Sequence, residues 1–347
     1  MGASTSRLFL SAAAFALVGS TPAYAQLAAC ANVANDAERL ACYDGLARAA
    51  SAPPAVETVP PAATTAAQKE AAAEPPPVVQ RGSTMDEHWE LRRDLKRGIF
   101  NLVPHRPLYG LIHWTDNRNE LPSSPTRNVT QQADLERAEG KIQLSFKTKM
   151  AEGVLGTPGD LWFGYTQVSY WQVGNQRNSS PFRETNYEPE ATLIYPLRLS
   201  SGDFRMRFAG LTLNHQSNGR SGEFSRSWNR LIGEVGAEYG NWSFHARPWL
   251  RVLESDPPRD DNPDIENYAG RGELVVTRRA GGHVLTLTGR HTLRGGDRSR
   301  GSLRFDYALP VVGALNLHFQ VFSGYGLNLI DYNHRQTTFG VGVSFLD

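Results

Sequence analysis

Apolar and polar residues alternate along the chain from about residue 106 to the C-terminus. One of these runs has apolar residues at Leu315, Leu317, Phe319 and Val321. A period of two is typical of β-strands, whose successive side chains point to opposite faces. We count about twelve such runs, and closed bacterial barrels prefer an even number of strands. The pattern therefore predicts an all-β, antiparallel domain of about twelve strands over residues 106–347.

The connections between these runs alternate between short and long. The short ones are tight turns at Gly240-Asn241, Ala280–Gly282 and Pro310–Gly313. The long ones cover residues 116–138, 173–183, 216–226, 254–266 and 326–336. Outer-membrane barrels place short turns on the periplasmic side and long loops outside the cell, so this arrangement predicts a transmembrane barrel.

The chemistry of the two strand faces favours a membrane barrel over a soluble β-sandwich. A sandwich would bury its apolar residues and expose its polar ones to water. Here the polar set contains too many charges for a dry core, and aromatic residues lie near the strand ends. A mean hydropathy of −0.42 is compatible with this fold, because barrel strands give a weak hydropathy signal. Lys+Arg 36 nearly balance Asp+Glu 35, so the charge gives no reason to expect a nucleic-acid partner.

The N-terminal region begins with a predicted secretory signal peptide over residues 1–25. Arg7 precedes the apolar stretch LFLSAAAFALVG, which is too short to span a membrane, and the small-residue site Ala23-Tyr24-Ala25 follows. The alternative is a lipoprotein cleavage box at residues 27–30, with Cys30 as the acylated residue.

Three further segments lead into the barrel. Residues 26–50 are expected to form a small helical hairpin closed by a Cys30–Cys42 disulfide, because an isolated cysteine pair in an exported chain usually forms one. Residues 51–84 are rich in Pro and Ala and predict a disordered, extended linker. Residues 85–105 form a charged run directly before the barrel. We expect this segment, called the N-terminal strap below, to pack as a strap or as a short helix.

The stretch LNHQSNGRSGEFSRSWNR, residues 213–230, contains the candidate catalytic residues. His215 and Ser217 are two residues apart and share a face if they lie on a strand. Asn229 is in the apolar phase of the following strand, with Leu231 and Val235. A serine, a histidine and a third polar group to orient the ring are the minimum for nucleophilic acyl transfer. A solvated loop tip is the alternative for such a polar run.

The phase of the first strand indicates that these residues point outward. Its apolar residues begin at even positions, Phe204, Met206 and Phe208, and continue at odd positions, Leu211 and Leu213. A bulge at Ala209-Gly210 is expected to cause this change. The odd phase places His215 and Ser217 toward lipid, where polar groups cost free energy. A purely structural barrel has no use for them there, whereas an enzyme that acts on lipid does.

The sequence resembles the outer-membrane phospholipase A family of Gram-negative bacteria over roughly residues 105–347. The likeness lies in the segments YGLIHWTDNRNELP (109–122), YTQVSYWQ (165–172), SSPFRETNYEP (179–189), NHQSNGR with SRSWNR (214–230), DDNPDI (260–265) and SGYGLNLIDYN (323–333). The resemblance implies a twelve-stranded outer-membrane barrel that hydrolyses sn-1 and sn-2 acyl esters of phospholipids and lysophospholipids. It also implies dependence on calcium and activity as a homodimer.

The resemblance also implies residue roles. Ser217 matches the nucleophile, His215 the general base and Asn229 the third member of the triad. The calcium ligands correspond to the Ser225 hydroxyl, the Arg220 backbone carbonyl and, from the partner subunit, Ser179. Polar positions of the dimer interface correspond to Gln167 and Thr185.

Some positions depart from the family pattern or receive no role. Gln216 and Gly222 stand where carboxylates sometimes occur, which leaves a second cation site open. The acidic stretch with Asp260, Asp261 and Asp264 is as consistent with a solvated loop as with cation binding, and it receives no role. There is no G-x-S-x-G motif to support an α/β-hydrolase. A catalytically inactive pore or binding barrel is the alternative for the whole chain, and the intact triad disfavours it.

Overall fold

The computed structural model describes residues 30, 33–51, 83–177, 182–256 and 259–345. The predicted signal peptide and residues 52–82 of the predicted linker lie outside the described residues, while Ser51 ends one helix and Thr84 begins another. The chain divides into two compact units, Met1–Pro77 and Val78–Asp347.

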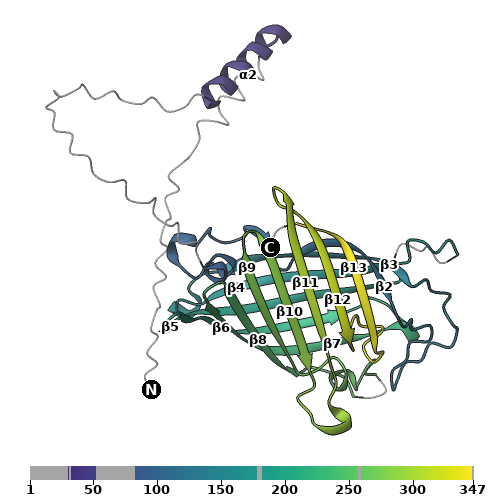
Figure 1. Ribbon diagram of the computed structural model, residues 1–347. Coiled ribbons are helices and arrows are strands. Elements are labelled where there is room, and N and C mark those ends of the chain that lie inside the picture. The colour runs from purple at the N-terminus through teal and green to yellow at the C-terminus, as the bar shows by residue number, and fades with distance from the viewer. Residues whose placement is uncertain (1–29, 31–32, 52–82, 178–181, 257–258, 346–347) are drawn as a thin grey trace, which may run out of the picture. The chain divides into compact units, whose positions relative to one another are not determined.

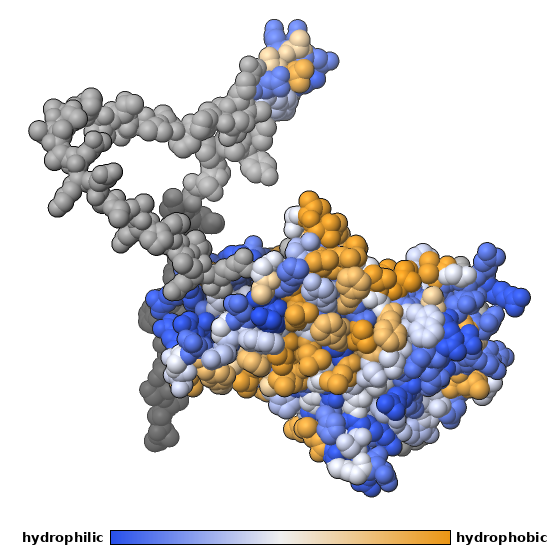
Figure 2. All heavy atoms as spheres, in the orientation of Figure 1, coloured by the Kyte–Doolittle hydropathy of each residue, from blue (hydrophilic) through white to orange (hydrophobic). Residues whose placement is uncertain are grey.

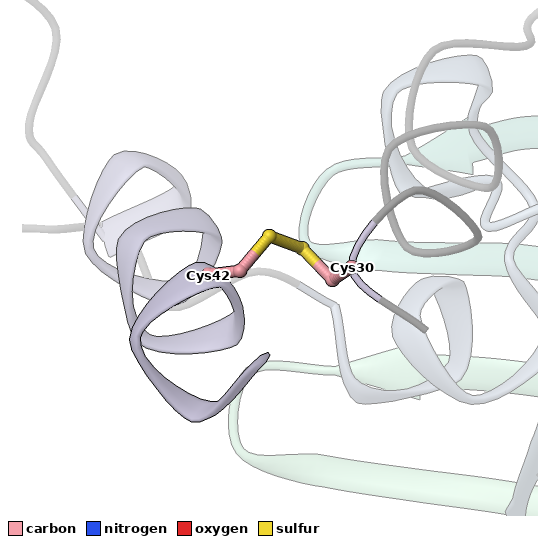
Figure 3. Close-up of a disulfide and its surroundings, with 2 residues drawn as sticks. All are labelled: Cys30 and Cys42. Carbon is pink, nitrogen blue, oxygen red and sulfur yellow. A yellow bond between two sulfur atoms is a disulfide. The ribbon is translucent and has the colours of Figure 1, made fainter. Parts of the chain in front are cut away.

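The first unit contains one described helix, α2 (Asp36–Ser51). Asn35 caps it, since the Asn35 side-chain oxygen accepts a hydrogen bond of 2.9 Å from the Ala37 backbone N–H. Cys42 in α2 forms a disulfide with Cys30 (Figure 3), which confirms the predicted pairing. The second arm of the predicted hairpin lies outside the described residues. Among the described helices, none combines the length and apolar character that crossing a membrane requires.

The second unit consists mainly of antiparallel strands. Its helical elements are α3 (Thr84–Trp89), η1 (Arg93–Leu95), η2 (Val154–Gly156), η3 (Gly222–Phe224), η4 (Ile265–Asn267) and η5 (Gly296–Arg298). Its strands are β1 (Leu102–Pro104), β2 (Leu108–Thr115), β3 (Ala138–Ala151), β4 (Asp160–Trp171), β5 (Glu184–Ser201), β6 (Phe204–Ser217), β7 (Ser227–Tyr239), β8 (Trp242–Arg251), β9 (Gly272–Ala280), β10 (His283–His291), β11 (Gly301–Val312), β12 (Leu315–Gly324) and β13 (Gln336–Phe345).

Strands β2 to β13 form a closed barrel (Figure 1). Each pairs antiparallel with its neighbour in sequence, and the pairing of β13 with β2 joins the last strand to the first. The short β1 is an additional strand that pairs with β3. A closed sheet satisfies every ladder hydrogen bond and leaves no open edge, which a bilayer requires. The prediction of a twelve-stranded antiparallel barrel is confirmed.

The outer wall is apolar and the interior is polar. Figure 2 shows hydrophobic side chains gathered in a band over the middle of the visible wall, with hydrophilic ones at its right-hand end. Large exposed residues in this part of the sheet include Leu287, Phe305, Phe319, Phe339 and Val341. The interior has a buried ion-pair network in which Glu190 contacts His105, Arg106 and Arg247. This distribution suits lipid outside and a polar interior.

The phase change in β6 occurs earlier than the sequence predicts. The register between β6 and β7 shifts between Met206 and Phe208, so the extra residue is Arg207 and not Ala209-Gly210. Phe208 therefore points inward and is 1% exposed. Gly236, its partner on β7, leaves space for this ring, because a Cβ there would lie 2.1 Å from Phe208. The odd positions that follow point outward, as predicted.

The N-terminal strap packs against the inner face of the barrel wall and contains the short helix α3. Trp89 of α3 makes edge-on contacts with Trp162 and Phe208, both with centroids 5.8 Å away. The Lys147 ammonium lies 3.9 Å from the centre of the Trp89 ring, within the range of a cation–π interaction. Glu238 of β7 accepts a hydrogen bond of 3.1 Å from the backbone N–H of Met85. Aromatic packing and polar contacts thus hold the strap against the inside of β3, β4, β6 and β7.

Replacing Trp89 with alanine is expected to destabilise the barrel, because the ring is 4% exposed and fills the space beside Trp162. Removal of a buried aromatic side chain typically costs roughly 3–5 kcal/mol. Urea-induced unfolding in detergent, followed by tryptophan fluorescence, measures the change. Phe100→Ala is the control, since Phe100 lies in the same strap but is 66% exposed. Equal midpoints for the two variants would contradict the role of Trp89.

Candidate functional site

His215 and Asn229 face each other on neighbouring strands of the outer wall. They are direct register partners on β6 and β7. The ring Nδ1 of His215 and the side-chain Oδ1 of Asn229 are 2.7 Å apart. Leu211 and Leu213, in the same phase of β6, are exposed on the wall. The ring and the amide therefore interact on the lipid-facing side, where the sequence places them.

This hydrogen bond determines the chemistry available to the imidazole. An amide oxygen can only accept, so Nδ1 of His215 carries the proton that forms the bond. The other ring nitrogen, Nε2, is then unprotonated in the neutral ring and can accept a proton. The arrangement suits a general base whose tautomer is set by its neighbour.

Ser217 is the last residue of β6 and follows His215 by two positions on the same strand face. Its register partners are Ser227 on β7 and Tyr187 on β5. Within the described residues, no hydrogen bond joins the Ser217 hydroxyl to the imidazole. Such bonds are often long in ligand-free enzymes and shorten when substrate binds. The structure thus contains the predicted contact between ring and amide, with Ser217 two positions further along the same face of β6.

The loop after β6 is folded around Asn218. The Asn218 side-chain oxygen accepts hydrogen bonds of 3.3 and 3.0 Å from the backbone N–H groups of Arg220 and Arg226. Its amide group donates a bond of 2.8 Å to the carbonyl of Phe224. Gly219 has a φ of 64° and needs to be glycine, since a Cβ there would also lie 3.0 Å from Tyr187. These bonds hold Arg220 and Ser225 in one compact loop.

Asp261, which the sequence analysis left without a role, lies in the loop between β8 and β9 and contacts the loop after β6. The hydroxyl of Ser225 donates a hydrogen bond of 2.6 Å to the Asp261 carboxylate, which also pairs with Arg127 at 2.9 Å. Hydroxyl, carboxylate and carbonyl oxygens are the donors that calcium prefers. The described residues contain no group of three His, Cys, Asp or Glu side chains that could hold a metal by themselves. The donor chemistry fits calcium, with Ser225 and Asp261 as neighbouring oxygens.

The remaining predicted positions are only partly described. Ser179 lies outside the described residues. Gln167 on β4 and Thr185 on β5 both contact Ser169, through hydrogen bonds of 3.2 and 3.1 Å between side chains. Gln167 is in the same strand phase as Phe163 and Trp171, which are exposed on the outer wall. The structure therefore joins Gln167 and Thr185 in one polar chain on the lipid-facing side.

Comparison with known proteins gives consistent matches over the barrel unit. The model of the Phospholipase A1 family matches residues 85–345. A putative phospholipase A1 of Neisseria meningitidis serogroup B is 40% identical over 267 residues, which cover 75% of this chain and 69% of that protein. Phospholipase A1 of Escherichia coli K12 is 37% identical over 248 residues, which cover 72% of this chain and 82% of the relative.

Solved structures match the same unit. The outer membrane phospholipase A from Escherichia coli superimposes with a TM-score of 0.65 at 34% identity, over 75% of this chain and 97% of that one. A Salmonella typhi outer membrane phospholipase, solved as a dimer with bound calcium, gives a TM-score of 0.66 at 35% identity over the same shares, 75% and 97%.

Proposed function

Because the chain belongs to the phospholipase A1 family, we propose that it is a calcium-dependent outer-membrane enzyme that hydrolyses both sn-1 and sn-2 acyl esters of glycerophospholipids and lysophospholipids. The observation that carries this proposal is the His215–Asn229 hydrogen bond on the lipid-facing wall, beside Ser217. A site on the outer wall meets its substrate where phospholipids already lie, so the substrate need not enter the barrel.

In the proposed mechanism, the Ser217 hydroxyl attacks the acyl carbonyl and forms an acyl-enzyme. His215 Nε2 takes the hydroxyl proton during attack and returns it to the departing alcohol of the lipid. Water then attacks the acyl-enzyme. His215 takes a proton from the water and returns it to the Ser217 oxygen as the fatty acid is released. Asn229 holds the Nδ1–H side of the ring but carries no charge, so it orients the base without stabilising imidazolium as an aspartate does.

Calcium would be held by the Ser225 hydroxyl and the Arg220 backbone carbonyl, with Asp261 adding a carboxylate from the loop between β8 and β9. Held there, calcium would supply positive charge near the oxyanion of the acyl-transfer step. In a homodimer, Ser179 from the partner copy would complete the ligand set. The Salmonella typhi relative, a dimer with bound calcium, supports this part of the proposal.

The test is release of fatty acid from phospholipid–detergent micelles by the purified full-length chain. Activity with millimolar calcium and loss of activity with a chelator are expected. Substrates labelled separately at the sn-1 and sn-2 chains report which ester is cleaved. If no fatty acid appears at saturating calcium, the chain is an inactive pore or binding barrel and the proposal fails.

Ser225→Ala is expected to weaken both calcium activation and dimerisation, because one ligand and the contact with Asp261 are lost together. Coupled binding is reciprocal, so a weaker calcium site also means a weaker dimer. Analytical ultracentrifugation over a calcium titration, run beside the activity assay, measures both effects. Ser299→Ala, a hydroxyl in the loop between β10 and β11, is the control. A monomer that is fully active at saturating calcium would contradict the proposed dimer.

A further inference from the structure

Asn229 is held by the three residues that follow β8, a segment that has no part in the triad. Val252 donates its backbone N–H to the carbonyl of Asn229 at 3.1 Å and extends the strand pairing by one residue. The backbone N–H of Asn229 donates to the Glu254 carboxylate at 2.5 Å. The side-chain Nδ2 of Asn229 donates to the carbonyl of Leu253 at 3.3 Å. The 252–254 segment thus contacts both the backbone and the side chain of Asn229.

The conformation of Leu253 makes these contacts possible. Its φ is 55°, in the left-handed region that is unfavourable for a residue with a Cβ. Its side chain is 85% exposed, so no packing of the leucine itself explains this conformation. The turn at Leu253 brings its own carbonyl and the next carboxylate to Asn229. Such strain persists when surrounding contacts demand it, and here those contacts converge on one residue of the proposed site, Asn229.

The contacts determine which way the Asn229 amide points. A backbone carbonyl can only accept, so the group that faces Leu253 must be the NH₂ end of the amide. The oxygen end then faces Nδ1 of His215, as the 2.7 Å contact requires. The opposite orientation would place an NH₂ group against the ring and favour the wrong tautomer. The 252–254 segment therefore selects the useful orientation.

Glu254 is itself fixed in position. Its second carboxylate oxygen accepts a hydrogen bond of 3.2 Å from Arg251, and Arg251 also pairs with Asp260 at 2.8 Å. The Glu254 side chain is 20% exposed. Burial raises the pKa of Glu254, while the Asn229 N–H and Arg251 oppose that rise by stabilising the carboxylate. One oxygen is thus anchored to arginine and the other is directed at the backbone of Asn229.

We propose that Glu254 is a positioning residue of the catalytic triad, which holds Asn229 in the orientation that presents its oxygen to His215. The inference rests on the proposed function of Ser217, His215 and Asn229. Without the carboxylate, the Asn229 N–H loses its acceptor and the strained turn at Leu253 relaxes. The Leu253 carbonyl then moves away from the amide, and both amide orientations become accessible. The loss is expected in kcat, because Glu254 contacts Asn229 and Arg251 and so acts on the reaction through the orientation of the base.

The test is a double-mutant cycle on kcat and KM with Glu254→Ala, Asn229→Ala and the combination of both. Glu254→Ala is expected to lower kcat by about ten- to a hundredfold, as small displacements of catalytic groups do, with KM nearly unchanged. In the Asn229→Ala background, the same substitution is expected to change kcat less than about threefold, because the side chain that it positions is already absent. Glu266→Ala is the matched control, since Glu266 lies in the same loop and pairs with Arg271 without contacting the triad.

The outcomes separate this inference from the function on which it rests. Equal losses from Glu254→Ala in both backgrounds would indicate a general structural effect and overturn the positioning role. So would a loss confined to KM, or a lowered unfolding midpoint that accounts for the loss of activity. If Asn229→Ala itself leaves kcat unchanged, the triad assignment fails and the role of Glu254 fails with it. If neither the wild type nor any variant releases fatty acid, the proposed function itself is wrong.

Discussion

Ser217→Ala is expected to give a folded, membrane-inserted barrel that releases no measurable fatty acid. The hydroxyl is the atom that forms the acyl-enzyme, so no neighbouring group can replace it. A nucleophile and its general base work together, and loss of the nucleophile typically lowers turnover by roughly 10³-fold or more. The substitution removes a single oxygen at the end of β6 and leaves the pairing with Ser227 and Tyr187 in place. Folding should therefore be unaffected.

Two measurements made on the same preparation separate loss of chemistry from loss of structure. Fatty-acid release from phospholipid micelles at saturating calcium reports turnover, and heat-dependent migration in detergent gels reports the folded barrel. Ser323→Ala is the matched control, because Ser323 is an outer-wall serine on β12 that bonds to Thr337 far from the triad. Turnover at the wild-type rate in Ser217→Ala would remove Ser217 as the nucleophile.

The barrel could be predicted from the sequence because its signal repeats in every strand. Alternation assigns each residue to one face of its strand. Once the faces and the number of strands are known, little further information is needed to predict a closed antiparallel sheet. The position of the bulge in β6 was predicted wrongly, and the reason is local packing. Phe208 turns inward because Gly236 on the next strand leaves space and Trp89 contacts the ring from the strap. Both contacts join residues far apart in the sequence, and a period of two contains no information about them.

In the candidate site too, some residues could be placed from the sequence and others could not. His215 and Asn229 could be placed together because both lie on strands, where phase and register decide which side chains meet. Asp261 and Glu254 could not, because they lie in the long loop after β8, which has no periodicity. Their contacts depend on how that loop folds back, over 36 residues to Ser225 and 25 residues to Asn229. The contacts of such loop residues therefore could not be predicted from the sequence and are seen only in the structure.

Replacing His215 and Asn229 separately is expected to give very different losses, although the two side chains share one hydrogen bond. His215→Ala removes the group that accepts the Ser217 proton, so its loss should approach that of Ser217→Ala. Asn229→Ala leaves the base in place and removes only its orientation. The ring can then rotate or change tautomer, but a fraction of molecules keeps the active arrangement. We expect a loss of about ten- to a hundredfold, with activity still measurable.

The ratio of the two losses distinguishes orientation from charge stabilisation. Asn229→Asp serves as a third variant, since it keeps an oxygen facing His215 and adds the charge that asparagine lacks. If orientation is the role of Asn229, the aspartate variant should retain more activity than the alanine variant, because the oxygen still accepts from Nδ1. kcat values measured at one saturating calcium concentration, on barrels verified as folded, provide the comparison. Equal inactivity of His215→Ala and Asn229→Ala in folded barrels would contradict this expectation, and Asn229 would then have a larger role than orientation of the ring.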